Sequence, residues 1–289
     1  MEETAPDSVL IGEVWEDGSN KIAYSQRRRY LLGSETHGLM NYPFRTALLA
    51  YVSGGDADDF REAMETLREN YPPAAFYSAM NFLGTHDTPR ILTLLGADRT
   101  PDTKAERASY RLLPRERAAG IAKLRLAALV LFTFPGSPMI YYGDEAGVCG
   151  WTDPDNRRTF PWGKEDLELT EFHRYLTGIR NRTPAFRRGA FKSLLAENGM
   201  IAYGRFDAGE QGVVVVNSED YAQRVRIPVW EAEVTADAMV RVMLTDAKRY
   251  NVGSLKYPVV DGVMEVELPG NGAMIFIARS SGQDDEKTA

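Results

Sequence analysis

The feature of this sequence that most constrains its fold is an alternation of short apolar runs with stretches of helical periodicity. Each apolar run ends in polar or acidic residues, and four of them span residues 9–15, 38–42, 79–87 and 138–145. This alternation is typical of parallel β-strands that are joined by helices. We therefore expect an α/β fold with a parallel sheet.

Three segments have the apolar spacing of helices that cover such a sheet. Residues 58–70 and 117–131 each place apolar side chains on one face, and residues 170–182 do the same before Pro184. Proline cannot continue a helix, so the third helix is expected to end there.

The pattern changes to short β-rich segments from about residue 186. They lie at residues 212–217, 223–229, 239–244 and 273–278, and they indicate a small all-β antiparallel domain. We expect an α/β region over residues 1–185, a β-sandwich over residues 186–280 and a disordered polar tail over residues 281–289.

Composition and charge exclude two classes of partner. The 34 basic and 41 acidic side chains give a net charge of −7 that is spread along the chain, which argues against nucleic acid. The longest apolar run, residues 126–134, is less than half the length of about 20 residues that a membrane span needs, so we expect no membrane segment. The single cysteine, Cys149, excludes an internal disulfide.

Two acidic residues at predicted strand ends are candidates for catalysis, because active groups of parallel α/β barrels lie at the carboxyl ends of the strands. Glu13 follows one run and precedes Trp15, which is large enough to stack on a sugar ring. Burial against such an apolar neighbour tends to raise a carboxyl pKa, as a proton donor requires. The alternative from position alone is a salt-bridged structural acid.

His86 and Asp87 form a second candidate pair at the end of the run over residues 79–87. A neutral donor beside an anion could hold sugar hydroxyls and stabilise positive charge in an oxocarbenium-like transition state. As isolated residues, the two fit a structural hydrogen-bond pair at least as well.

Five phrases, taken together and in this order, resemble the α-amylase superfamily of retaining α-glucan hydrolases and transferases. Leu-Ile-Gly-Glu-Val-Trp at residues 10–15, Phe-Leu-Gly-Thr-His-Asp at 82–87 and Gly-Ser-Pro-Met-Ile-Tyr-Tyr-Gly-Asp-Glu at 136–145 are similar to the fifth, seventh and eighth strand segments of that family. Met-Asn-Tyr-Pro-Phe at 40–44 and Asp-Pro-Asp-Asn-Arg-Arg at 153–158 are similar to the neopullulanase, cyclomaltodextrinase and maltogenic amylase branch.

The resemblance implies that the α/β region is the second half, strands five to eight, of a (β/α)₈ barrel. It also implies a role for each matching residue. Glu13 would be the acid/base, His86 and Asp87 would hold the hydroxyls of the cleaved sugar, and Trp15 would line the leaving-group side. The further substrate contacts implied by the matching phrases are Asn41, Tyr42, Asp153 and Arg157.

One element of the family pattern is missing from this sequence. The nucleophilic aspartate of the family lies in a Gly-x-Arg-x-Asp phrase on the fourth strand, which would precede Met1, and no such phrase occurs here. A retaining glycosidase needs two carboxyl groups about 5–5.5 Å apart. We therefore expect a fragment that is inactive alone. The alternative is a non-catalytic sugar-binding or interaction protein derived from the same barrel.

The same resemblance shapes the expectations for partners, cofactors and location. The substrate would be an α-glucan, and the open barrel edges predict a homodimer or pairing with the missing half. No cofactor is expected, because no Asp-x-Asp-x-Asp calcium loop occurs; calcium in the missing half stays open. Localisation is unknown, with the cytoplasm slightly favoured, because a signal would precede this segment.

Two other conspicuous features have simple structural interpretations. His173 is expected at the surface or at a helix cap. The run of Arg27, Arg28 and Arg29 is expected to be a solvated face.

Overall fold

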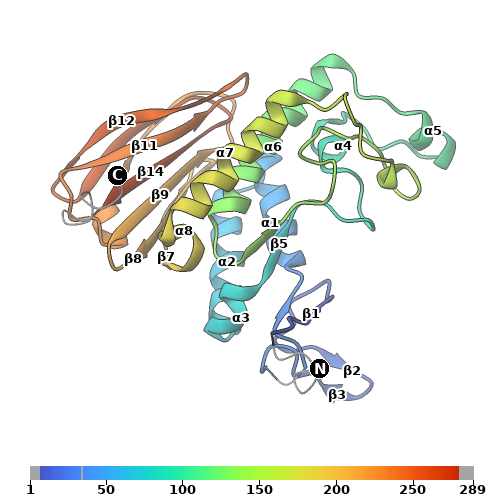
Figure 1. Ribbon diagram of the computed structural model, residues 1–289, viewed down its shortest axis with the longest axis horizontal. Coiled ribbons are helices and arrows are strands. Elements are labelled where there is room, and N and C mark those ends of the chain that lie inside the picture. The colour runs from blue at the N-terminus through green and yellow to red at the C-terminus, as the bar shows by residue number, and fades with distance from the viewer. Residues whose placement is uncertain (1–6, 34, 280–289) are drawn as a thin grey trace.

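The structure, a computed structural model, describes residues 7–33 and 35–279 (Figure 1). Short parallel strands and helices form the part up to residue 188, and a large antiparallel sheet forms the rest. The predicted tail over residues 281–289 lies outside the described residues.

Four short parallel strands lie in the four apolar runs that predict them. They are β1 (Ile11–Gly12), β4 (Gly38–Leu39), β5 (Met80–Phe82) and β6 (Ser137–Met139). β1 pairs with β4 and β5 pairs with β6, both in parallel, and a parallel bridge between Met40 and Met80 joins the two pairs. The strands therefore lie side by side in chain order. Between β1 and β4 the chain forms a hairpin of β2 (Ile22–Ala23) and β3 (Gln26–Arg27).

Helices follow the parallel strands, and the three predicted helices are among them. The long helices are α1 (Tyr42–Val52), α2 (Ala57–Asn70), α6 (Pro114–Thr133) and α7 (Leu167–Arg182). The short ones are α3 (Pro73–Ser78), α4 (Ile91–Gly96), α5 (Lys104–Ser109), the 3₁₀ turn η1 (Asp155–Arg157) and α8 (Pro184–Arg188). No helix in the described part of the chain is long and apolar enough to cross a bilayer.

The expectation for His173 is wrong. His173 lies in the interior of α7, is buried, and packs edge-on against Phe132 and Phe172. Its Nδ1 lies 2.9 Å from the carbonyl oxygen of Leu169, and burial lowers the pKa of the imidazole. The apolar face of α7 thus includes the histidine, because its ring packs with the neighbouring phenyl rings.

Eight antiparallel strands form one hydrogen-bonded sheet after residue 189. Their spatial order is β10 (Gln223–Ile227), β13 (Val263–Leu268), β12 (Tyr250–Val260), β11 (Ala238–Thr245), β14 (Gly272–Arg279), β9 (Glu210–Asn217), β8 (Met200–Asp207) and β7 (Ala190–Glu197). The continuous order arises because β12 pairs with both β11 and β13. This sheet stands beside α7 and α8 in Figure 1.

Both faces of this sheet are buried at its centre. Val214 and Val216 of β9 belong to the core shared with the helices, whereas Val213 and Val215 belong to a second apolar core. The second core also takes side chains from β10, β13 and the 3₁₀ turn η2 (Val229–Ala232). A continuous apolar run such as β9 is typical of a strand covered on both sides.

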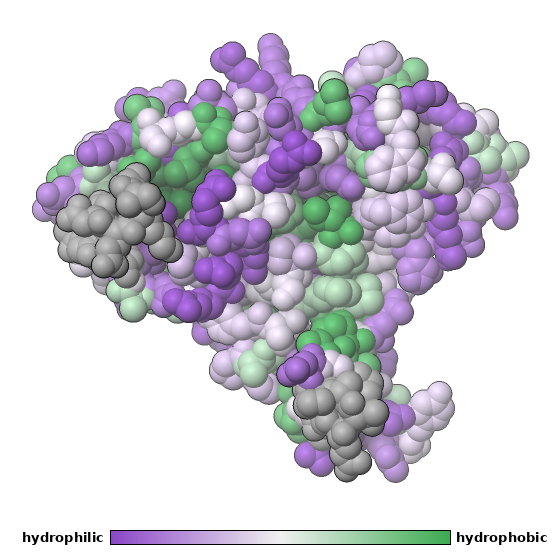
Figure 2. Space-filling model, in the orientation of Figure 1, coloured by the Kyte–Doolittle hydropathy of each residue, from purple (hydrophilic) through white to green (hydrophobic). Residues whose placement is uncertain are grey.

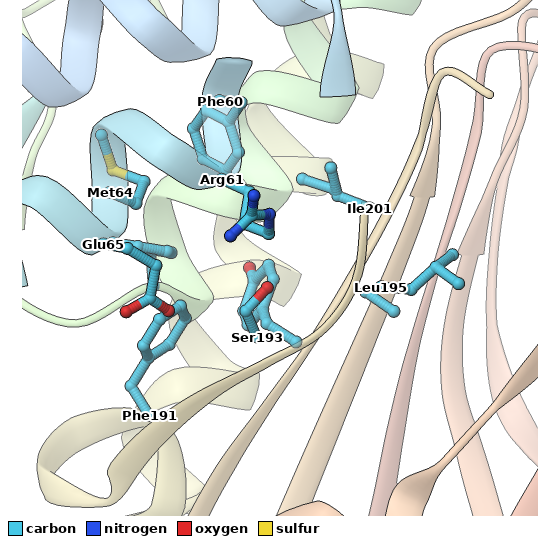
Figure 3. Close-up of a pocket in the computed structure, with 11 residues that line it drawn as sticks. Phe60, Arg61, Met64, Glu65, Phe191, Ser193, Leu195 and Ile201 are labelled. Carbon is cyan, nitrogen blue, oxygen red and sulfur yellow. The ribbon is translucent and has the colours of Figure 1, made fainter. Parts of the chain in front are cut away.

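An aromatic cluster at the end of α6 joins the helices to the sheet. The ring of Phe134 lies 5.2 Å from that of Phe44, 4.9 Å from that of Phe191 and 5.6 Å from that of Tyr203, measured between ring centroids. Figure 3 shows Phe60 and Met64 of α2 facing β7 beside this cluster, around a hollow of only about 10 Å³. The junction is therefore closely packed.

The aromatic cluster yields a stability prediction. Phe134→Ala is expected to lower the free energy of unfolding by about 3–5 kcal/mol, because it leaves a cavity between helices and sheet. Chemical denaturation followed by circular dichroism measures this change. The control Leu167→Ala alters an exposed side chain at the start of α7 and should stay within about 0.5 kcal/mol of the parent chain. A similar small loss for Phe134→Ala would contradict the close packing.

A buried ion pair connects the segments that follow β5 and β6. Arg90, at the start of α4, is 0% exposed, and its Nη1 lies 3.1 Å from Oδ1 of Asp144, which is 4% exposed. The same nitrogen donates to the carbonyl oxygen of Tyr142. A Cβ atom on Gly84 would lie 2.4 Å from the carboxylate of Asp144, so only glycine fits there.

Burial dominates the ionisation of Asp144. It raises the pKa of this carboxyl to about 7, although the charge and the hydrogen bond of Arg90 oppose the shift. The free energy lost when the carboxylate of Asp144 leaves water thus exceeds the free energy gained from its interaction with Arg90, as is common for buried ion pairs.

This raised pKa predicts a pH dependence of stability. Between the unfolded pKa near 3.9 and the folded pKa, the folded chain holds the extra proton, so this contribution to the free energy of unfolding falls as pH rises. Asp144→Asn removes this titrating group and with it this pH dependence. The free energy of unfolding of the parent chain, relative to that of Asp144→Asn, should fall by up to about 4 kcal/mol between acidic and slightly alkaline pH.

Denaturation series at several pH values measure this difference, and Asp207→Asn is the control. The hydrogen bond from Arg188 lowers the pKa of the half-buried Asp207, so the stability difference between the parent chain and Asp207→Asn should change in the opposite direction with pH. If the free energy of unfolding of the parent chain rose relative to that of Asp144→Asn as pH increased, the attraction of Arg90 for the carboxylate would be stronger than the effect of burial on its pKa.

Candidate functional site

Four segments bring polar side chains to the same end of the parallel strands. Glu13 follows β1, Tyr42 follows β4, and the pair His86–Asp87 follows β5. The loop after β6 contains η1, with Arg157 as its last residue. Because the strands are parallel, their carboxyl ends lie on one side of the sheet, where barrel enzymes hold their active groups.

Two hydrogen bonds hold the carboxylate of Glu13. The Tyr42 hydroxyl donates to Oε1 of Glu13 over 2.9 Å, and the Trp15 indole donates to the same oxygen over 3.1 Å. The rings of Trp15 and Tyr42 are stacked, with centroids 4.3 Å apart and an interplanar angle of 16°. The packing of two aromatic rings therefore fixes the position of one carboxylate oxygen.

The expected burial of Glu13 against Trp15 is not observed in this chain. Glu13 is exposed, and Trp15 keeps 55% of its surface accessible. Trp15 acts instead as a hydrogen-bond donor to the carboxylate, with one ring face on Tyr42.

Tyr42 stays protonated because of its surroundings. Burial raises the pKa of its hydroxyl to about 12, and the hydrogen bond and charge of Glu13 add to this shift. The charge of Asp87 raises the pKa further. The tyrosine therefore keeps its proton at neutral pH and donates a lasting hydrogen bond to Glu13.

A line of charges continues from Asp87 to Asp153. Nε2 of His86 lies 3.4 Å from Oδ2 of Asp87, and Nη2 of Arg157 lies 3.5 Å from Oδ1 of the same carboxylate. Nε of Arg157 lies 3.6 Å from Oδ1 of Asp153 and donates to the carbonyl oxygen of His86 over 3.2 Å. The structure thus brings together Glu13, Trp15, Tyr42, His86, Asp87, Asp153 and Arg157.

Asn41 has a different place from the other candidates. It is buried, its side-chain amide donates to Oδ1 of Asn81 over 2.8 Å, and its Oδ1 accepts from the backbone N–H of Phe44. Asn41 therefore caps α1 and ties β4 to β5 rather than facing the other site residues.

Two side chains that the sequence did not single out position the His86–Asp87 segment. Nδ2 of Asn156, which is 0% exposed, donates to the carbonyl oxygens of His86 over 2.7 Å and of Thr88 over 2.8 Å. Oγ1 of Thr85 accepts from the backbone N–H of Asp87 over 3.2 Å. The only sequence signal for Asn156 was its place beside Arg157 in a turn-forming stretch.

The site groups are a carboxylate with two donors, an exposed imidazole and a second carboxylate beside a guanidinium. This set suits the gripping of sugar hydroxyls and proton transfer to a glycosidic oxygen. Among residues 7–33 and 35–279, no group of three or more His, Cys, Asp or Glu side chains is arranged to hold a metal ion.

Three relatives show where this chain stands among characterised proteins. It is 32% identical over 296 residues to an amylopullulanase of Thermoanaerobacter thermohydrosulfuricus, covering 94% of this chain and 18% of that protein. It is 30% identical to a cyclomaltodextrinase of Geobacillus thermopakistaniensis and 31% identical to neopullulanase 2 of Thermoactinomyces vulgaris, covering 78% of this chain and 34% of each relative. The chain therefore spans about a third or less of these relatives.

Solved structures show the same fold. A cyclomaltodextrinase superposes with a TM-score of 0.72 at 27% identity, covering 95% of this chain and 41% of that one. A debranching enzyme of Nostoc punctiforme superposes with a TM-score of 0.72 at 24% identity, covering 95% of this chain and 53% of that one. The second likeness is one of fold alone.

The family model for the alpha amylase catalytic domain matches residues 1–237, which is most of the chain. With the strand-end site and the relatives above, this match shows that the chain belongs to the α-amylase family of glycoside hydrolases, in the branch of the cyclomaltodextrinases and neopullulanases.

Proposed function

We propose that this chain supplies the acid/base half of a retaining site that cleaves α-glucosidic bonds. The observation that carries the proposal is the position of Glu13 at the carboxyl ends of the parallel strands, where its Oε1 accepts hydrogen bonds from Tyr42 and Trp15 and where the pair His86–Asp87 also lies. The cyclomaltodextrinase and neopullulanase relatives support starch-like glucans or cyclodextrins as the substrate class.

In this proposal the parallel strands β1, β4, β5 and β6 are strands five to eight of a (β/α)₈ barrel. Residues 1–185 form the barrel half and residues 186–280 the β-domain. The continuous pairing from β1 to β6 in chain order supports this arrangement. The outer strands leave two edges open, and a complementary half or a second copy would cover them.

Each site residue has a defined task in the proposed reaction. Glu13, held by Tyr42 and Trp15, donates its proton to the glycosidic oxygen as the bond breaks. His86 and Asp87 bind hydroxyls of the sugar that becomes oxocarbenium-like, and the carboxylate of Asp87 stabilises its positive charge. Asp153 and Arg157 extend the same surface toward the next sugar.

The second carboxyl that a retaining mechanism requires is not Asp87 in this proposal. Asp87 is engaged by His86 and Arg157, and its task is to hold hydroxyls rather than to attack the anomeric carbon. The nucleophile would come from the complementary barrel half, so we propose that this chain alone binds sugar without cleaving it.

The prediction is that the purified chain binds maltooligosaccharide with no release of reducing sugar. Asp87→Asn should weaken binding about tenfold, because it removes a charge-assisted hydrogen bond to a hydroxyl. Titration calorimetry measures binding, and a reducing-sugar assay measures cleavage. Asp207→Asn is the matched control, because that carboxylate lies on the distant sheet in an exposed pair with Arg188.

Two results would count against the proposal. Equal affinity of the parent chain and Asp87→Asn for the maltooligosaccharide would show that the sugar does not bind at this site. Cleavage by the chain alone that disappears in Glu13→Gln would show that a nucleophile is present in this sequence after all.

A further inference from the structure

A second hollow lies beside the β2–β3 hairpin, at the end of α2. Its volume is about 420 Å³, within the range of small-molecule sites. Its wall combines the apolar residues Leu31, Leu32 and Pro72 with a group of polar and basic residues: Ser19, Asn20, Arg27, Arg28, Arg29 and Asn70. None of the wall residues belongs to the strand-end site, so the inference does not depend on the proposed glucan chemistry.

The three arginines carry positive charge that the described part of the chain does not neutralise with a salt bridge. Of the neighbouring carboxylates, Glu16 pairs with Lys21. Asp17 accepts from the neutral donors Ser19 N–H and Asn70, and Glu35 accepts from the backbone N–H of Arg29, so these two carboxylates offset part of the positive charge of the three arginines. Nη2 of Arg27 donates to Oδ1 of Asn20 over 2.7 Å, which orients its guanidinium without cancelling its charge. The hollow therefore has an excess of positive charge.

Two polar atoms of this wall are buried without a hydrogen-bond partner among the described residues. They are Nε of Arg28 and Oγ of Ser19. Buried donors are nearly always paired, because an unpaired one loses its hydrogen bonds to water without a replacement. A guanidinium N–H and a hydroxyl in one polar hollow are both donors suited to an oxyanion.

The guanidinium of Arg28 also contacts an aromatic ring. Its carbon lies 5.3 Å from the ring centroid of Tyr24, an exposed residue at the tip of the hairpin. Tyr24 and Ser25 both have positive φ angles, which gives the tight hairpin turn that carries Tyr24 back toward Arg28.

We infer that this hollow binds the phosphate group of a small ligand. A phosphate offers several acceptor oxygens, which match a cluster of guanidinium groups better than a neutral sugar does. The group can come from inorganic phosphate or from a phosphate ester on a sugar or glucan. The guanidinium groups of Arg27, Arg28 and Arg29 would bind its oxygens, and Ser19 would donate once its buried Oγ turns toward the ligand.

Calorimetric titration of the full chain with inorganic phosphate tests this site, with glucose 6-phosphate and a phosphorylated maltooligosaccharide as parallel probes. Arg28→Gln should weaken phosphate binding at least about tenfold, as expected for one charge-assisted hydrogen bond. Ser19→Ala keeps all the charges and should weaken it by a smaller factor. Equal affinity for the three probes identifies the phosphate group alone as the ligand. Tighter binding of an ester identifies the ester only where Arg28→Gln removes the gain, because the maltooligosaccharide part can also bind at the strand-end site.

Arg226→Gln is the matched control, because Arg226 is an exposed arginine on β10 of the distant sheet. It should bind phosphate as the parent chain does. Circular dichroism verifies folding of each variant, and Ser19→Ala decides the result if Arg28→Gln does not fold. No binding of phosphate by the parent chain, equal losses in Arg226→Gln and Arg28→Gln, or no effect of Ser19→Ala and Arg28→Gln would each overturn the inference.

Discussion

The arrangement of the strand-end site depends on the buried pair of Arg90 and Asp144. Arg90 follows the His86–Asp87 segment directly, whereas Asp144 belongs to the turn after β6 that leads to Asp153. The ion pair therefore fixes the His86–Asp87 segment relative to the loop that carries Asp153. Its burial is costly, as the raised pKa of Asp144 shows, and this cost is offset by the close packing of Gly84 and of the tyrosine rings under the guanidinium.

Burial and exposure are divided within the site. The groups that set positions, Tyr42 and Asn156, are buried, whereas Glu13 and His86 are exposed. Figure 2 shows hydrophilic residues over much of the visible face of the molecule, with hydrophobic patches between them. A buried tyrosine keeps its proton and donates in one direction, so it can hold a carboxylate in place. The groups proposed to act on the sugar are thus exposed, whereas the groups that position them are buried, an arrangement that favours a preorganised site.

Periodicity and phrase order predicted the four strands and the three covering helices, because these patterns report directly on which faces are buried. They did not predict the burial of Arg90 or Asp144, since a charged residue in a loop carries no sign of what will pack around it. The same limit explains His173, whose burial depends on two phenylalanine rings, one of them on another helix. Nor did they show that Asn41 caps α1, since a strand-end amide can cap a helix as readily as it can face a ligand.

Glu13 is exposed in this chain, so its proposed role as a proton donor depends on the proposed pairing of barrel halves. Large apolar side chains beside the outer strands β1 and β6 are accessible to solvent: Val9, Leu10, Ile140 and Tyr142. Such a surface next to open strand edges favours coverage by another element. Coverage would remove water from Glu13 while Tyr42 and Trp15 keep their hydrogen bonds to it, and desolvation favours the protonated carboxyl. A proton donor would then be formed by assembly, from a carboxylate that is already in position.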